Sequence, residues 1–186
     1  MREALVALVE EVQALRRELS AATTRIGELE ALADTDPLLG VLNRRAFVRE
    51  LNRALAMVER YGVASALLFA DLNDLKKIND TLGHAAGDAA LAQVARLLER
   101  NVRQTDAVGR LGGDEFGIIL TRTDEATAKR KAESLAEAVA AEPVAWSGAP
   151  FAVRISCGVV EIRKGATIEE ALHLADTAMY AAKKAR

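Results

Sequence analysis

The stretch R-L-G-G-D-E-F-G-I-I-L, residues 110–120, puts two adjacent carboxylates at the corner of an otherwise apolar element. The glycine pair at 112–113 predicts a tight hairpin turn, and the apolar run after Glu115 is typical of a buried strand. Asp114 and Glu115 then lie at the end of that hairpin. Acids that converge at a sheet edge repel one another unless a cation neutralises them. A cation site is one interpretation, and a solvated turn, the usual setting of Asp beside Gly, is the other.

Helices and strands alternate around this hairpin. The apolar periodicity predicts a helix over 43–59, a strand over 64–70, a helix over 88–102, the hairpin, a helix over 125–141, a strand over 151–162 and a last helix beginning at Thr167. Glu170 is placed to complete a capping box with Thr167. The order β-α-β-β-α-β, with an extra helix at each end, predicts a ferredoxin-like α+β sandwich, an antiparallel sheet with helices on one face.

Residues 1–33 have a different pattern from the rest of the chain. Apolar residues recur there at alternating spacings of three and four: Leu5, Leu8, Val12, Leu15, Leu19, Ala22, Ile26, Leu29 and Ala33. This spacing predicts a coiled-coil helix that forms a homodimer. A single amphipathic helix packed on its own domain is the alternative, although such a helix favours a 3.6-residue period. Pro37 ends the helix. The sequence thus predicts a dimerisation helix over 1–33 and a globular domain over 34–186.

The composition limits the class of protein. The 186 residues are 51% hydrophobic and 28% charged, enough for one domain with a proper core. The net charge of −2 gives no reason to expect nucleic acid or an anionic membrane as partner. The single cysteine, Cys157, excludes an internal disulfide and is expected to be a small buried hydrophobe. Neither a membrane span nor a signal peptide is found, so the chain is expected to be cytoplasmic, without a membrane segment.

A second group of polar residues follows the strand expected over 64–70. Asp71 ends this strand, and the expected topology places it beside the acids of the hairpin turn. Carboxylate oxygens are ligands that suit Mg²⁺, which keeps waters and phosphate oxygens in its other positions. Asn79 and Asp88 offer hydrogen-bonding groups that complement guanine, and Lys76 and Lys77 offer positive charge for phosphates. This strand-to-helix connection therefore predicts a nucleoside triphosphate pocket beside a metal site.

Five blocks of sequence, in order, resemble the GGDEF family, the diguanylate cyclases. Residues 112–116 spell the family signature itself. The other four blocks similar to those of the family are residues 36–45, 79–88, 156–158 and 175–183. The similarity extends over residues 32–186, so the globular domain as a whole is identified as a member of this family.

The resemblance implies a reaction and the residues that carry it out. Members of the family condense two GTP molecules into cyclic di-GMP and release two pyrophosphates. The resemblance implies that Mg²⁺, with Mn²⁺ as a substitute, binds to Asp71, Asp114, Glu115 and the backbone carbonyl of Leu72. It implies Asp114, Glu115 and Lys76 as catalytic residues, with Asp114 helping to deprotonate the attacking 3′-hydroxyl.

The resemblance also implies which residues bind GTP. Asn79 and Asp88 would read guanine with His84 nearby, and Lys76 and Lys183 would bind phosphates. A structural role in the loop is the alternative for His84, and solvation is the alternative for the lysines.

Some positions depart from the family pattern. Lys77 matches no family lysine and is expected to be solvated. The chain ends at Arg186, so the phosphate-binding arginine expected just beyond Lys183 is missing or displaced to Arg186. Leu39 and Val41 stand at the entry turn in place of the family's usual Thr and Leu. Asn73 stands where many members have a second Asp, and Leu75 where many have Phe, so these two positions bear on affinity rather than on metal binding.

Two features imply control of the reaction. The product has twofold symmetry, so two domains must face each other, and a coiled coil over 1–33 would raise the local concentration of the second domain. Arg103 and Asp106 match the R-x-x-D of the family's inhibitory site, which implies feedback inhibition by cyclic di-GMP. An exposed ion pair at a helix end, worth little by itself, is the alternative for these two residues.

Three other functions remain open from the sequence. A catalytically silent GGDEF module would bind GTP or cyclic di-GMP as a receptor, although intact Asp71, Asp114 and Glu115 argue against it. A purely structural dimerisation module is supported only by residues 1–33. A cyclase that forms a different product is disfavoured by Asp88, whose carboxylate suits the donor edge of guanine.

Overall fold

The computed structural model describes residues 11–20, 23 and 34–184, and it divides into two units, Met1–Asp34 and Thr35–Arg186. In the first unit, residues 11–20 are helical. Three positions of the predicted heptad pattern, Val12, Leu15 and Leu19, are 40%, 57% and 70% exposed. The other heptad positions lie outside the described residues, and the coiled-coil dimer stays a prediction.

The second unit alternates helices and strands. Its elements are α2 (Arg44–Tyr61), β1 (Ser65–Leu72), α3 (Leu75–Leu82), α4 (His84–Arg100), β2 (Ala107–Arg110), β3 (Glu115–Thr121), α5 (Glu125–Ala141), β4 (Ile155–Glu161) and α6 (Ile168–Lys184). The strands form one sheet in the order β2-β3-β1-β4, and all neighbouring strands are antiparallel. The predicted β-α-β-β-α-β order and the antiparallel sheet are thereby confirmed.

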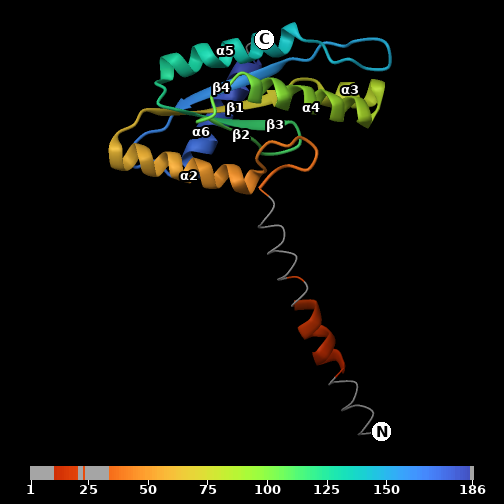
Figure 1. Ribbon diagram of the computed structural model, residues 1–186, viewed down its shortest axis with the longest axis vertical. Helices are drawn as coiled ribbons and strands as arrows, with labels where there is room; N and C mark the ends of the chain where they lie inside the picture. Colours follow the sequence, from red (N-terminus) through yellow and green to blue (C-terminus); the bar gives the residue numbers. More distant parts are fainter. Residues whose placement is uncertain (1–10, 21–22, 24–33, 185–186) are drawn as a thin grey trace. The chain divides into compact units, whose positions relative to one another are not determined.

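Helices cover both faces of the sheet. Figure 1 shows α4 and α5 on one side, and α2 and α6 on the other. The prediction of helices on one face was wrong here, because the two extra helices form a layer of their own. The central strand β1 is buried along its whole length. Leu68 and Ala70 belong to the core under α4 and α5, whereas Leu67 and Phe69 belong to the core under α2 and α6.

The segment expected to be a strand-to-helix connection contains a helix of its own, α3. Asp74, with φ of 61°, makes the turn from β1 into α3, and Gly83, with φ of 88°, separates α3 from α4. Helix α3 is only eight residues long, so its apolar positions Leu75, Ile78 and Leu82 form too short a run to be recognised as a helix in the sequence. The helix expected over 88–102 accordingly starts earlier, and the strand expected over 151–162 is confined to β4.

The last helix is fixed at its start and along its side. Thr167 and Glu170 form the predicted capping box, with the Glu170 amide donating to Thr167 Oγ1 over 3.2 Å and the Thr167 amide donating to Glu170 Oε2 over 2.9 Å. A Cβ at Gly158 of β4 would stand 2.1 Å from the Met179 backbone nitrogen. Only glycine permits this close approach of α6 to the sheet, which brings the last turn of α6 to the end of β1.

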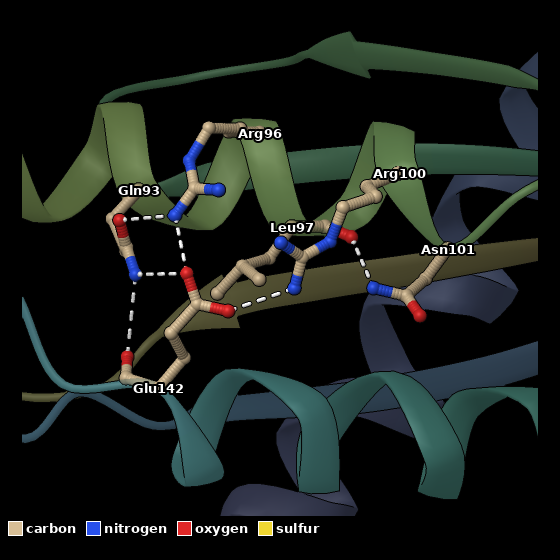
Figure 2. A network of polar contacts seen from close by, with 6 residues as sticks. All are labelled: Gln93, Arg96, Leu97, Arg100, Asn101 and Glu142. Atoms are coloured by element: carbon tan, nitrogen blue, oxygen red, sulfur yellow. Dashed lines mark hydrogen bonds and ion pairs between the residues drawn. The ribbon is translucent and has the colours of Figure 1, made fainter.

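A polar network joins α4 to the end of α5 (Figure 2). The carboxylate of Glu142 accepts from Arg96 over 2.5 Å and from Arg100 over 2.7 Å, and Gln93 donates to it over 3.2 Å. Hydrogen bonds from the two arginines lower the pKa of Glu142 to about 2. The network therefore holds together two of the helices that cover one face of the sheet.

The expectations about Cys157 and about membrane-spanning helices can be compared with the described residues. Cys157 on β4 is half-buried and packs against the core, so it is less enclosed than predicted. None of the helices in the described part of the chain has the length and apolarity that crossing a bilayer requires.

Candidate active site

Three acids lie together where β1 ends and β3 begins. Asp71 of β1 is paired directly with Glu115 of β3, and the Leu72 amide donates to the Asp114 carbonyl over 3.0 Å. The hairpin turn is thus joined by a hydrogen bond to the end of the central strand. This is the juxtaposition that the sequence predicted from a buried strand beside a glycine turn.

Negative charge accumulates at this point. Asp71 is only 7% exposed, and burial, with Asp114 and Asp176 nearby, raises its pKa despite a hydrogen bond from Lys183. Burial and the charges of Asp114, Asp176 and Asp71 raise the pKa of Glu115. The ammonium of Lys183 donates to Oδ1 of Asp71, and this bond raises the pKa of Lys183. One ammonium therefore faces several carboxylates, and a further cation at this point would stabilise the cluster.

The donor set fits a hard divalent cation. Within the described residues, no three His, Cys, Asp or Glu side chains are grouped closely enough to hold a metal by themselves. Mg²⁺ does not need three, because one or two carboxylates suffice when waters and substrate phosphates complete its octahedron. The carboxylates of Asp71 and Asp114 and the carbonyl of Leu72 are oxygen donors of this kind. Lys183 engages one oxygen of Asp71 and leaves the other for such a cation.

A cavity of about 650 Å³ opens beside Asp71, between α3 and the segment that leads into β4. Its walls are fixed to one another, because Ser156 Oγ donates to Asn73 Oδ1 over 2.9 Å and the Asn73 amide donates to the Arg154 carbonyl over 2.9 Å. The residues that line it are Asn73, Asp74, Lys77, Ile78, Thr81, Leu82, Phe151, Ala152, Arg154, Ser156 and Lys183.

The lysines of the site differ from expectation in one respect. Lys183 lines the cavity as well as contacting Asp71. Lys77 is exposed, as expected, yet it lines the cavity too, whereas Lys76 is not among the residues that line it. Arg154 was not singled out in the sequence, because a lone arginine before an apolar strand carries no recognisable pattern. The cavity thus has three cationic side chains in its wall.

The residues expected to read guanine lie where α3 meets α4. Asn79 is on α3, and its side-chain oxygen is buried without a hydrogen-bond partner. The Asn79 side chain rests on Gly87 of α4, where a Cβ would stand 1.9 Å from that oxygen. Asp88 and His84 are exposed on the first turns of α4. The buried oxygen has hydrogen-bonding capacity that the described protein atoms leave unused, which fits a ligand in this place.

Two arginines hold the hairpin turn in shape, and the sequence did not reveal them. Arg110 donates to the carbonyls of Gly112 and Gly113 over 3.1 and 2.8 Å, and to Oδ2 of Asp36 over 3.2 Å. Arg44 donates to the Leu111 carbonyl over 2.7 Å. Asp36 is 74 residues away from Arg110 in the chain, so only the fold reveals this contact.

A further acid, Asp176, was also missed. A small cavity of about 260 Å³ on the α2 and α6 side of the sheet is lined by Glu115, Asp176, His173 and Arg44, among others. Asp176 contributes to the raised pKa of both Asp71 and Glu115. Asp176 lies within the block 175–183 that supported the resemblance. Its place in that block was the signal in the sequence that could have identified it.

The R-x-x-D pair lies at the other end of β2 from the acids. Asp106 accepts from the Arg103 amide over 3.0 Å and from the Thr121 amide over 3.1 Å, so its carboxylate fixes the start of the hairpin. Arg103 is exposed. Both residues line a cavity of about 190 Å³, together with Glu99, Val102, Gln104 and Val108. The four residues of β2 separate Asp106 from the acid turn by roughly 13 Å.

Comparisons with known proteins agree with one another. The sequence matches the family described as "Diguanylate cyclase, GGDEF domain" over residues 33–186. It is 34% identical over 181 residues to "Diguanylate cyclase DgcP" of Pseudomonas aeruginosa, an alignment that covers 97% of this chain and 27% of that protein. The chain spans about a quarter of the length of that curated relative.

Solved structures share the fold. The GGDEF domain of DgcB from Caulobacter crescentus in complex with c-di-GMP superposes with a TM-score of 0.79 at 31% identity, covering 82% of this chain and 91% of that chain. The coiled coil and GGDEF domain of DgcB, also in complex with c-di-GMP, superposes with a TM-score of 0.78 at 27% identity, covering 96% and 95% of the two chains.

Proposed function

The chain belongs to the diguanylate cyclase GGDEF-domain family, and on this premise we propose that it condenses two GTP molecules into cyclic di-GMP and two pyrophosphates. The observation that carries the proposal is the convergence of Asp71, Asp114 and Glu115 where β1 meets the hairpin. A protein that had lost the reaction would have no need for acids whose burial and mutual repulsion raise their pKa. The similarity to proteins named as diguanylate cyclases gives independent support.

A divalent cation completes the proposed site. Asp71, Asp114 and the carbonyl of Leu72, with Glu115 beside them, would hold Mg²⁺ or Mn²⁺. The bound metal supplies Lewis acidity, which lowers the pKa of the 3′-hydroxyl and neutralises charge that develops at the α-phosphate. The raised pKa of Asp71 is in keeping with this role, since a second positive charge there offsets the burial and the repulsion that Lys183 alone leaves in place.

The protein's own groups orient the substrate and move the proton. Asp114 lies at the turn that Arg110 holds in shape, and its carboxylate accepts the proton of the attacking hydroxyl. Lys183 extends from the last turn of α6 to the boundary between the acids and the 650 Å³ cavity, where it binds a phosphate oxygen. Its raised pKa keeps it protonated for that purpose. Lys76, exposed on α3, is the second phosphate ligand of the proposal.

Guanine is recognised where α3 meets α4. The unused amide of Asn79 pairs with polar atoms of the base, and the exposed carboxylate of Asp88 accepts from its N1 and exocyclic amino groups. His84, the first residue of α4, lies beside them. An acceptor at position 88 favours guanine over adenine, because N1 of adenine has no hydrogen to donate.

Two copies of the chain are needed for one product molecule. Each domain binds one GTP, and the 3′-hydroxyl of each must reach the α-phosphate of the other. We propose that residues 1–33 pair as a coiled coil, for which the exposed Val12, Leu15 and Leu19 are a suitable seam. The similar structure of DgcB, which comprises a coiled coil and a GGDEF domain, supports this arrangement.

Feedback by the product is part of the proposal. Arg103 has a guanidinium free to clamp a phosphate or stack on guanine, while Asp106 keeps the R-x-x-D segment in shape. Cyclic di-GMP bound at this cavity would restrain the hairpin that carries Asp114. An Arg103→Ala variant is expected to synthesise product without slowing as product accumulates.

The reaction itself is tested by chromatography of the products. The full chain is incubated with GTP and Mg²⁺ beside an Asp114→Ala variant of equal thermal stability. Cyclic di-GMP and pyrophosphate are expected from the parent in a one-to-two ratio, and neither from the variant. A parent that binds GTP and forms a dimer but gives no product would contradict the proposal and favour a receptor.

A further inference from the structure

The 650 Å³ cavity has more positive charge than the proposed phosphate ligands account for. Lys183 is one of its cations, but Lys77 from α3 and Arg154 from the segment before β4 also line it. These two come from opposite walls, and Asp74 is the one carboxylate among the lining residues. A cavity with an excess of cations is suited to a polyanion.

We propose that Lys77 and Arg154 bind the β- and γ-phosphates of GTP in this cavity, and retain the pyrophosphate after the reaction. The inference rests on the proposed function for the position of the α-phosphate, which is set by the acids at the end of β1. From there the nucleotide extends in two directions. Ribose and guanine extend to Asn79, on the side of α3 that faces α4, so the terminal phosphates extend to the cavity bounded by Lys77.

The cavity wall has the groups that a diphosphate requires. The planar guanidinium of Arg154 presents paired donors that match phosphate oxygens, whereas Lys77 and Lys183 act as point charges. The Arg154 backbone is anchored by the Asn73 amide over 2.9 Å, and Ser156 holds the Asn73 side chain. The backbone of Arg154 is therefore held in place, although its side chain is exposed.

These cations would also favour the chemical step. As the 3′-oxygen bonds to the α-phosphorus, the bond from that phosphorus to the bridging oxygen breaks. The electron pair of the broken bond stays with the pyrophosphate, and the hydroxyl proton passes to Asp114. Negative charge thus grows on the leaving group, and Lys77 and Arg154 lie where that charge would develop.

Binding of unreactive nucleotides separates this inference from the cyclase reaction. Calorimetric titrations with Mg²⁺ compare GMP, GDP and 3′-deoxy-GTP, which lacks the attacking hydroxyl. Lys77→Gln and Arg154→Gln are each expected to weaken 3′-deoxy-GTP about tenfold, to weaken GDP less, and to leave GMP unchanged. Lys164→Gln, which removes the same charge from the exposed loop before α6, is the control and is expected to change none of the three.

Competition by pyrophosphate and variants that keep the charge distinguish the possible outcomes. Inorganic pyrophosphate is expected to compete with 3′-deoxy-GTP in the parent and to do so about tenfold less well in either variant. Lys77→Arg and Arg154→Lys, which keep the charge, are expected to retain most of the affinity. The inference would be overturned if the variants weakened the binding of GMP and of 3′-deoxy-GTP equally. It would also be overturned if the variants weakened pyrophosphate binding and left 3′-deoxy-GTP binding unchanged. A graded loss in a chain that makes no cyclic di-GMP would uphold the inference and refute the cyclase.

Discussion

Glu115 is a residue whose charge opposes folding. Burial raises its pKa, and the neighbouring charges of Asp114, Asp176 and Asp71 raise it further. A carboxyl whose pKa is higher in the folded than in the unfolded state binds its proton more readily when folded. Stability therefore falls as the pH rises from the unfolded value near 4.5 through the raised folded value, and the whole penalty is present above that window.

Glu115→Gln is accordingly expected to raise the melting temperature by a few degrees at pH 7.5 without metal, and to give no gain below about pH 4. Thermal unfolding at both pH values checks this, with Glu133→Gln on the exposed face of α5 as the control. Added Mg²⁺ is expected to shrink the gain, because the cation relieves the same repulsion. A variant that is less stable than the parent at pH 7.5 would show that Glu115 is not repelled in the folded state.

Gly87 is required by its neighbour rather than by its own backbone. A methyl group there would stand 1.9 Å from Asn79 Oδ1, so Gly87→Ala must displace that side chain. Helix α4 itself would gain from the change, by about 0.5–1 kcal/mol of intrinsic propensity. We expect GTP affinity to fall about tenfold without loss of stability. In an Asn79→Ala background, Gly87→Ala should cause no further loss of GTP affinity. An undiminished loss there would show that Gly87 does not act on guanine binding through Asn79.

At the scale of elements, the strength of the local signal decided which predictions succeeded. The hairpin was predictable because the glycine pair and the apolar run after it leave few alternatives. Helix α3 was not, because its eight residues give too short a periodic run, and its orientation decides that Lys77 and not Lys76 lines the cavity. Contacts such as Arg110 with Asp36 join residues far apart in the chain, and no periodicity in a single sequence reports them.

Arg110 turns the hairpin into a fixed support for Asp114. Its guanidinium bonds two carbonyls of the turn and Asp36, so Arg110→Ala frees a loop whose carboxylate must meet the substrate within a fraction of an ångström. We expect kcat to fall between about tenfold and a hundredfold, with little change in KM. Asp36→Asn keeps the bonds to Gly112 and Gly113 and should cost less in kcat. An equal loss in both variants would instead point to the contact with Asp36.

At the scale of the whole molecule, the fold separates the tasks of the proposed reaction. The acids lie at the ends of β1 and β3, the base-reading residues lie where α3 meets α4, and the cationic cavity lies on the other side of α3. The R-x-x-D cavity lies at the far end of β2, so product bound there would act on the acids through the hairpin rather than by covering them. In the proposed reaction, one domain binds one GTP. The proposed reaction also requires a second domain to face the first.

We propose that the helix of the first unit holds the second domain in place. Val12, Leu15 and Leu19 are exposed in the single chain, and pairing two such helices would bury them. Leu15→Glu with Leu19→Glu is expected to yield monomers whose turnover per chain, at low protein concentration, falls at least about tenfold, because the second domain is no longer held nearby. Turnover should recover as the concentration rises. Arg17→Glu, on another face of the same helix, is the control. Sedimentation gives the oligomeric state and product chromatography gives the rate, and a double variant that is monomeric yet fully active at low concentration would remove residues 1–33 from the reaction.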